Sequence, residues 1–167
     1  NPKIEKVGFD LAAAGYALCI IDSGADHANL TDEYAAIPAE MKKVCAFFGK
    51  EVLRQISRDE FMKALPELRK TVSDRAILRA MHIYQENDRV VKLVQALKEG
   101  NVDSFLNLVK ESGRSSWMYL QNITPAGAVA HQEVAVALAM CDMALHGRGA
   151  YRVHGGGFAG TVQAFVP

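Results

Sequence analysis

Near its end the chain carries four glycines within six positions, 155–160, between two short runs rich in β-branched and aromatic residues. The flanking runs are 150–154 and 161–166. Glycine reaches positive φ at little steric cost and leaves no Cβ between the backbone and its neighbours. The pattern therefore predicts two strands joined by a loop that turns sharply or comes close to another group.

The spacing Gly155-x-Gly157-x-x-Gly160 formally matches a dinucleotide-binding fingerprint. In that motif the loop follows a strand and opens a helix, whose N-terminus receives the pyrophosphate. Here residues 161–166 have a strand pattern, which argues against this interpretation. From spacing alone, a wide hairpin turn and a loop that faces a ligand both stay open.

Most of the remaining chain is expected to be helical. The predicted helices are 31–48, 58–65, 74–99, 102–120 and 128–145. Thr31, Ser57 and Ser73 are candidate N-caps, and Pro38 should kink or break the first helix. The last helix is apolar almost all round, which predicts burial between other layers.

Two further strands are expected near the N-terminus. The compact apolar run 16–21 predicts a buried strand, with 7–11 as a candidate partner. The order of strand pair, helices and strand pair predicts an α+β fold, with helices on one face of a small, mostly antiparallel sheet. The 167 residues fit one domain.

Composition restricts the class of partner. Nineteen basic and nineteen acidic residues give a formal net charge of zero, so there is no electrostatic case for binding nucleic acid or an anionic membrane. No apolar stretch reaches the length of a membrane span. The three cysteines lie in apolar patterns, which favours buried free thiols and a cytoplasmic location.

Three blocks of sequence carry a resemblance to one family. The run 154–160, His-Gly-Gly-Gly-Phe-Ala-Gly followed by a strand, resembles the third signature motif of the galactose/homoserine/mevalonate/phosphomevalonate (GHMP) kinase superfamily. The segment 22–34 resembles the galactokinase segment that runs from a central strand into a helix. The segment 79–86 is similar to the galactokinase helix with a histidine and a glutamate one turn apart, and Glu111-Ser112 also falls where that family commonly has it. The blocks occur in the family's order.

The resemblance implies that residues 1–167 form the GHMP-kinase C-terminal domain of a galactokinase, without the family's last helix and strand. The intact enzyme would phosphorylate the C1 hydroxyl of galactose with ATP and Mg²⁺. The serine-rich phosphate loop, the sugar-binding signature and the catalytic base belong to an N-terminal half that this sequence lacks. We therefore expect no kinase activity from these residues alone, and we assign them no catalytic residue and no metal ligand.

The resemblance assigns two roles in binding. Tyr34 aligns with the tyrosine whose hydroxyl contacts the sugar, although a partly buried helix tyrosine would be ordinary. Gly155, Gly156, Gly157 and Gly160 would form the loop that supports the phosphate site, with a structural turn as the alternative. Two departures from the family pattern are Ala159, usually glycine, and Gly113, often histidine after the serine; neither should abolish the fold.

Other candidate residues have ordinary structural explanations. Asp22, Asp26 and His27 are expected to cap loops rather than to bind metal. His82 and Glu86 share a helix face and should make structural hydrogen bonds or ion pairs, as should Glu86 with Arg89. Without a basic patch, Trp117 and Tyr119 are expected to pack in the core rather than to stack on bases.

Alternative functions stay open at this stage. The whole protein could phosphorylate another sugar, such as N-acetylgalactosamine or arabinose. It could instead be a catalytically dead galactokinase-like regulator that binds sugar and ATP, or a free-standing structural domain. The expected partners are galactose, ATP and the missing N-terminal half, and the apolar face left exposed without that half should be buried by a partner or a dimer.

Overall fold

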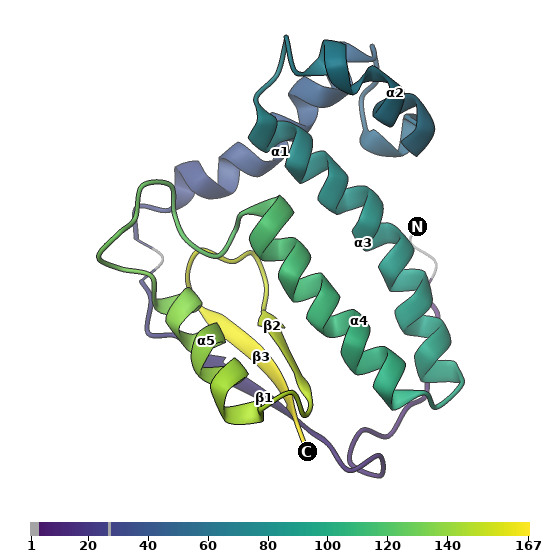
Figure 1. The fold of residues 1–167 in the computed structure, drawn as a ribbon, viewed down its shortest axis with the longest axis vertical. Coiled ribbons are helices and arrows are strands. Elements are labelled where there is room, and N and C mark those ends of the chain that lie inside the picture. Colours follow the sequence, from purple (N-terminus) through teal and green to yellow (C-terminus); the bar gives the residue numbers. More distant parts are fainter. Residues whose placement is uncertain (1–3, 27) are drawn as a thin grey trace.

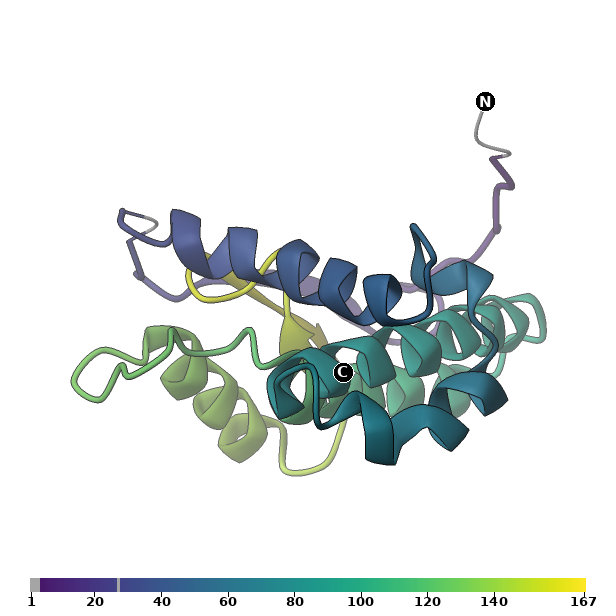
Figure 2. The same cartoon turned by 90° about the horizontal axis from the view of Figure 1, so that it is seen from above.

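The computed structural model describes residues 4–26 and 28–167 (Figure 1). The elements are β1 (Ala17–Asp22), α1 (Thr31–Phe47), a 3₁₀ turn η1 (Leu53–Gln55), α2 (Arg58–Leu68), α3 (Asp74–Lys98), α4 (Val102–Ser115), a π-helical turn η2 (Ser116–Leu120), α5 (Glu133–Leu145), β2 (Ala150–Val153) and β3 (Thr161–Val166). Helices α3 and α4 run side by side, and the three strands form one sheet (Figure 1, Figure 2). Within the described residues, no helix combines the length and the apolar character needed to cross a membrane.

The sheet is antiparallel throughout, with the strand order β1-β3-β2. The hairpin of β2 and β3 pairs Val153 with Val162 and Ala150 with Phe165. The first strand, β1, pairs with β3 over its whole length. The predicted α+β class and the predicted final hairpin are therefore confirmed.

Helices contact both faces of this sheet. Successive residues of a strand point to opposite faces, so Ala164 and Phe165 of β3 separate the two sides. Ala164 packs in a cluster with residues of α5, whereas Phe165 packs with Leu106 and Val109 of α4. We expected helices on one face of the sheet only. In the structure α5 packs on one face and α4 packs on the opposite face.

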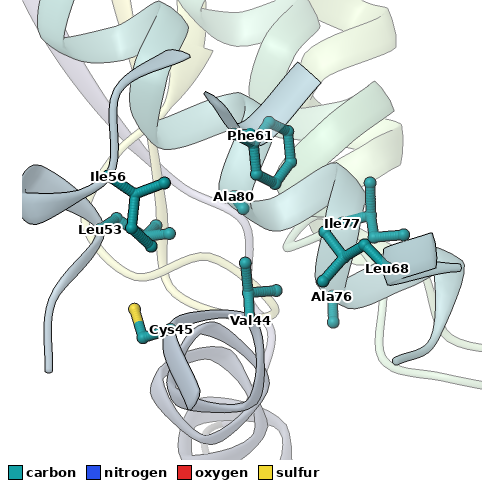
Figure 3. Packing of buried hydrophobic residues seen from close by; sticks show 9 residues of the cluster. All are labelled: Val44, Cys45, Leu53, Ile56, Phe61, Leu68, Ala76, Ile77 and Ala80. Carbon is teal, nitrogen blue, oxygen red and sulfur yellow. The ribbon is translucent and has the colours of Figure 1, made fainter. Parts of the chain in front are cut away.

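The helical region, made of α1, α2 and α3, has its own core (Figure 3). The buried members are Val44, Cys45, Leu53, Ile56, Phe61, Leu68, Ala76, Ile77 and Ala80. Phe61 projects from α2 toward Ala80 of α3, and it is completely buried. This cluster joins the three helices into one packed unit.

The N-cap residues predicted from the sequence are correct for two of the three helices. The hydroxyl oxygens of Ser57 and Ser73 accept hydrogen bonds from the backbone N–H groups of Glu60 and Ala76, both at 3.2 Å, so both predicted N-caps are confirmed. The predicted Thr31 cap is wrong, because α1 already includes Thr31 and its cap position is Leu30. Helix α1 also continues through Pro38 without a break.

The expectation of a buried first strand is wrong. The side chains of Leu18 and Ile20 in β1 are each 51% exposed. The proposed partner 7–11 is irregular chain that leads into a turn, so in the described chain β1 pairs with β3 alone and forms an edge of the sheet. An edge strand without a covering layer leaves its apolar side chains in contact with solvent.

Helix α5 also departs from the expectation of complete burial. It begins at Glu133 rather than 128, and its outer apolar residues Val136, Met140 and Met143 are exposed. The buried side of α5 contacts the sheet, but no other layer covers its outer side within the described chain. Between β1 and α5 lies a groove of about 600 Å³, lined by Ile21, Val136 and Met140 among others; we call it the β1–α5 groove.

The predicted burial is confirmed for two of the three cysteines and is wrong for the tryptophan. All three cysteines are free, as expected; Cys45 and Cys141 are buried and Cys19 is half-buried. Burial raises the pKa of the Cys45 and Cys141 thiols, which keeps them protonated. The prediction that Trp117 packs in the core is wrong, because 49% of its surface is exposed.

Candidate functional site

The glycine loop, residues 154–160, closes the hairpin of β2 and β3. The backbone N–H of His154 donates to the carbonyl of Thr161 at 2.9 Å, which marks the base of the loop. Gly155, Gly157 and Gly160 all have positive φ, between 74° and 85°. Glycine is the residue that adopts this conformation without strain, so the local turn alone already explains three of the four predicted glycines.

Alanine at position 159 fits the loop. Ala159 does not have positive φ, whereas the preceding Phe158 does, with φ of 59°. Ala159 is buried, and its backbone N–H donates to the carbonyl of Gly157 at 2.7 Å. The departure from the family pattern therefore adds a methyl group without requiring a left-handed alanine.

Asn122, in the turn that follows η2, holds the loop from one side. Its side-chain Nδ2 donates to the carbonyl of Gly156 at 2.9 Å, and its own carbonyl accepts from the N–H of Phe158 at 2.6 Å. A Cβ at Gly157 would lie 2.0 Å from the Asn122 carbonyl oxygen. Gly157 is thus required by close approach as well as by its φ.

Tyr34, in the first turn of α1, holds the loop from the other side. Its hydroxyl donates to the carbonyl of Gly157 at 2.8 Å, and its ring packs edge-on against Phe158 with centroids 5.5 Å apart. A Cβ at Gly156 would lie 3.0 Å from the Tyr34 ring. Burial raises the pKa of Tyr34, so the phenol stays protonated and can donate. The structure thus brings the predicted sugar contact and the predicted phosphate loop together across 123 residues of sequence.

The far end of the loop is anchored to β1. Both the backbone N–H and the hydroxyl of Ser23 donate to the carbonyl of Gly160, at 2.9 and 2.6 Å. Three separate segments therefore fix the loop: the end of β1, the start of α1 and the turn at Asn122. Sequence reasoning found Tyr34 but missed Ser23 and Asn122, whose contacts are to backbone atoms distant in sequence and leave no local pattern.

Arg79 supports the turn that carries Asn122. The Arg79 side chain is fully buried; its Nε donates to the carbonyl of Leu120 at 3.0 Å and its Nη1 to Glu40 of α1 at 2.9 Å. Burial lowers the pKa of this guanidinium, and the adjacent Glu40 opposes that effect. Arg79 thereby ties α3 to α1 and to the residues just before Asn122.

The acidic residues at the end of β1 and in the loop before α1 act as expected. An Asp22 oxygen accepts from the N–H of Gly24, and an Asp26 oxygen accepts from the N–H of Ala28, both at 2.9 Å. These are short-range contacts that stabilise turns. His27 lies outside the described residues. Within those residues, no three His, Cys, Asp or Glu side chains come together as a metal site would require.

His82 and Glu86 make structural contacts, as predicted, but not with each other. The Nδ1 of His82 lies 2.8 Å from the Ser115 hydroxyl, and burial lowers the pKa of His82. Glu86 pairs with Arg89 and accepts from the Ser112 hydroxyl. The network links α3 to α4.

Gly113 lets α4 approach β2 closely. A Cβ there would lie 3.0 Å from the Cβ of Arg152. Any residue with a Cβ at this position would require α4 and β2 to move slightly apart. Gly113 and this close packing therefore belong together, which accounts for the second departure from the family pattern.

Comparison with known proteins shows which proteins this chain is similar to. No protein-family model matches the sequence. The galactokinase of Glaesserella parasuis serovar 5 is 31% identical over 153 residues, which cover 92% of this chain and 38% of that protein. A galactokinase of Actinobacillus pleuropneumoniae serotype 5b is 30% identical over the same lengths. The chain is a homologue of part of galactokinase.

The fold agrees with that relationship. The crystal structure of Lactococcus lactis galactokinase complexed with galactose matches with a TM-score of 0.71 over 90% of this chain and 37% of that one, at 23% identity. The chain spans less than two-fifths of the length of these galactokinase relatives. The predicted relationship to part of galactokinase and the predicted fold class are therefore confirmed, whereas the roles of Tyr34 and of the four glycines stay predictions.

Proposed function

We propose that this chain is the C-terminal domain of a galactokinase. The intact protein would transfer the γ-phosphate of ATP, with Mg²⁺, to the C1 hydroxyl of galactose in the cytoplasm. The observation that carries the proposal is the direct contact between Tyr34 and the glycine loop, in a chain that is homologous to galactokinases over 92% of its length. A sugar contact and a phosphate-supporting loop must lie close together, because phosphoryl transfer depends on positioning the two substrates.

In this proposal the domain forms one wall of the active site. Tyr34 contacts the sugar through its phenol, and the loop with Gly155, Gly156, Gly157 and Gly160 supports the segment that binds the phosphates. Glycines allow that segment to approach the loop backbone without obstruction by side chains. ATP, Mg²⁺ and the catalytic base are held by the N-terminal half of the intact enzyme.

The exposed apolar surface suits a domain that packs against more protein. Leu18 and Ile20 of β1 and Met140 of α5 all lie exposed in the described chain. Exposed apolar side chains of this kind commonly mark an interface. We propose that it is buried in the intact protein and that the isolated chain buries it by dimerisation, which sedimentation analysis of residues 1–167 would detect. A strictly monomeric isolated chain would count against this part of the proposal.

A coupled assay of ADP release tests the activity. The isolated chain is expected to show no galactose-dependent turnover, and the complete protein is expected to show it. Turnover by the isolated chain would overturn the assignment of the base and phosphate loop to the other half. Activity of the complete protein with N-acetylgalactosamine or arabinose but not galactose would change the substrate, and inactivity with all three would favour a regulator.

Tyr34→Phe in the complete protein tests the sugar contact. The variant keeps the ring against Phe158 and removes only the hydroxyl. We expect a higher KM for galactose with an unchanged KM for ATP. An equal effect on both substrates would instead indicate that the hydroxyl acts structurally, as in its hydrogen bond to Gly157.

A further inference from the structure

Two grooves flank α5, and they differ in charge. The β1–α5 groove has the acidic residues Asp22 and Glu133 among its lining residues. On the other side, a groove of about 710 Å³ opens between α4 and α5 over β2, the strand drawn between these helices in Figure 1. It is lined from the segments 110–118, 138–149 and 151–152, and we call it the α4–α5 groove. Its volume lies within the range of about 300–1,000 Å³ that is common for small-molecule sites.

Small residues keep the α4–α5 groove open. Ala139 of α5, and Gly147 and Gly149 before β2, place almost no side-chain volume in it. Gly149 is fixed by its surroundings, because a Cβ there would lie 2.1 Å from the carbonyl oxygen of Phe165. The hollow therefore arises from the backbone path and not from a mobile side chain.

The inside of the groove is apolar. Leu138 and Leu145 of α5 are buried and contribute to its lining, and Met118 and Trp117 from η2 lie on the opposite side. Half of the Trp117 surface is exposed. A half-exposed indole beside a methionine offers a flat apolar surface, to which a flat apolar or aromatic group would bind well.

Basic side chains border this apolar interior. Lys110, Arg114 and Arg148 line the groove, and within the described chain none of them forms an ion pair. A fourth basic residue, Arg152, already contacts Glu86 and Ser112. Three cations without a carboxylate partner favour an anion at this site.

The acidic residue in the groove already has a hydrogen-bond partner. Asp142 is the one carboxylate among the described residues that line it, and it accepts a hydrogen bond from the Tyr151 hydroxyl at 2.7 Å. Burial and this hydrogen bond raise the pKa of Tyr151 to about 12, so the phenol remains a donor to Asp142. The three free cations therefore outnumber the carboxylate, which has a partner of its own.

We propose that the α4–α5 groove binds a small organic anion with a flat apolar body, the body against Trp117 and Leu138 and the charge near Arg114 and Arg148. None of the glycine-loop residues and not Tyr34 lines this groove, so the site is separate from the proposed kinase site. A smaller cavity of about 360 Å³ shares Trp117, but its arginine, Arg75, is paired with Glu40. Of these three cavities, only the α4–α5 groove combines apolar walls with unpaired cations.

The one tryptophan of the chain provides the readout. In a ¹H–¹⁵N NMR spectrum of residues 1–167, the indole N–H of Trp117 gives a single side-chain signal. We expect naphthalene-2-sulfonate to move that signal saturably. The neutral analogue 2-naphthalenemethanol should bind at least about fivefold more weakly, as expected for the loss of an interaction worth about 1 kcal/mol.

Two matched pairs of variants assign the site. Arg114→Glu should weaken binding of the sulfonate at least about fivefold, whereas Lys63→Glu, an equal charge change on exposed α2, should not. Ala139→Phe should block the groove and abolish the shift, whereas Ala144→Phe, on the β1–α5 side of the same helix, should leave it intact. If Ala139→Phe does not fold, the charge-reversal pair decides.

Several results would overturn the proposal. They are a Trp117 signal that does not move, equal binding of the neutral analogue, and equal weakening by Lys63→Glu and Arg114→Glu. Binding lost with Ala144→Phe but kept with Ala139→Phe would place the probe in the β1–α5 groove instead. Each of these outcomes is independent of kinase activity, so the proposed function can stand or fail separately.

Discussion

The helical region (α1, α2 and α3) and the sheet region (β1, β2, β3 and α5) differ in how fully their apolar side chains are buried. In the helical region, the cluster around Phe61 draws its members from α1, η1 and the residue after it, α2 and α3, and each of them is buried (Figure 3). In the sheet region, β1 pairs with β3 and α5 packs on the sheet, but both leave apolar side chains exposed, among them Leu18, Ile20 and Met140. The difference suggests that the helical region is stable by its own packing, whereas the sheet region is shaped to receive more protein.

The two regions meet at the glycine loop. Tyr34 belongs to the helical region, the loop belongs to the sheet hairpin, and Asn122 comes from the turn between them. The hydrogen bonds of Tyr34 and Asn122 are to backbone groups of the loop, and Phe158 adds one ring contact with Tyr34, so the contacts depend mainly on the position of the loop. The loop is therefore the part of the sheet region that the helical region holds in place.

The largest expected effect is in the helical core. Phe61→Ala removes a completely buried ring and leaves a cavity among Val44, Ile77 and Ala80. We expect the free energy of unfolding to fall by about 3–5 kcal/mol, the usual cost of such a truncation. Urea denaturation followed by circular dichroism measures it. A loss below about 1 kcal/mol would contradict the claim that this region is the more fully buried one.

The second effect tests how tightly the loop is held. In Gly157→Ala, the new residue must adopt a positive φ and its Cβ clashes with the Asn122 carbonyl oxygen. In Gly155→Ala, the new residue must adopt a positive φ, but nothing lies within 4 Å of its Cβ. We expect Gly155→Ala to cost about 1 kcal/mol and Gly157→Ala clearly more, up to about 3 kcal/mol. The same denaturation measurement compares them. Equal losses would mean that Asn122 can move aside and does not fix the loop.

How far these features could be predicted depends on the range of the interactions involved. Ser57 and Ser73 cap their helices through a backbone group three residues away, so the sequence pattern contained all that was needed. The contact of Asn122 with Gly156 spans 34 residues, and no local pattern encodes it. Resemblance to a family located Tyr34 and the glycines, but not the turn that supports them.

The exposure of β1 was missed for another reason. An apolar run such as 16–21 predicts a strand that is buried in its final environment. Its burial depends on the layers that cover it, and within the described chain no layer covers the outer side of β1 or α5. The element was predicted correctly and its burial was not, because burial is a property of the whole assembly around a strand.

A third prediction concerns the link between the two helices α3 and α4. Burial lowers the pKa of His82 below its usual 6.5, so the unfolded chain binds a proton more readily than the folded one. The stability is therefore fully present above pH 6.5 and falls as the pH is lowered from there, by no more than about 1.4 kcal/mol per pH unit from this group.

His82→Gln provides the comparison for this effect. Glutamine can still form a hydrogen bond with Ser115 but does not titrate, so its unfolding free energy should depend less on pH between 7 and 5. Urea denaturation at several pH values compares the two proteins. Parallel pH dependences would show that other groups, and not the buried imidazole, control the acid stability.

The smallest expected effect is on the open side of the sheet region. Met140 is apolar, like the residues around Phe61, but it is exposed and lines the β1–α5 groove. Met140→Ala in the isolated chain should change the free energy of unfolding by less than about 0.5 kcal/mol, as for most surface substitutions. In the complete protein proposed above, the same substitution should cost about 2 kcal/mol or more, because the side chain would then be buried. Denaturation of both proteins separates the two cases. A large loss in the isolated chain would show that this face is already covered, and no loss in the complete protein would show that it stays open.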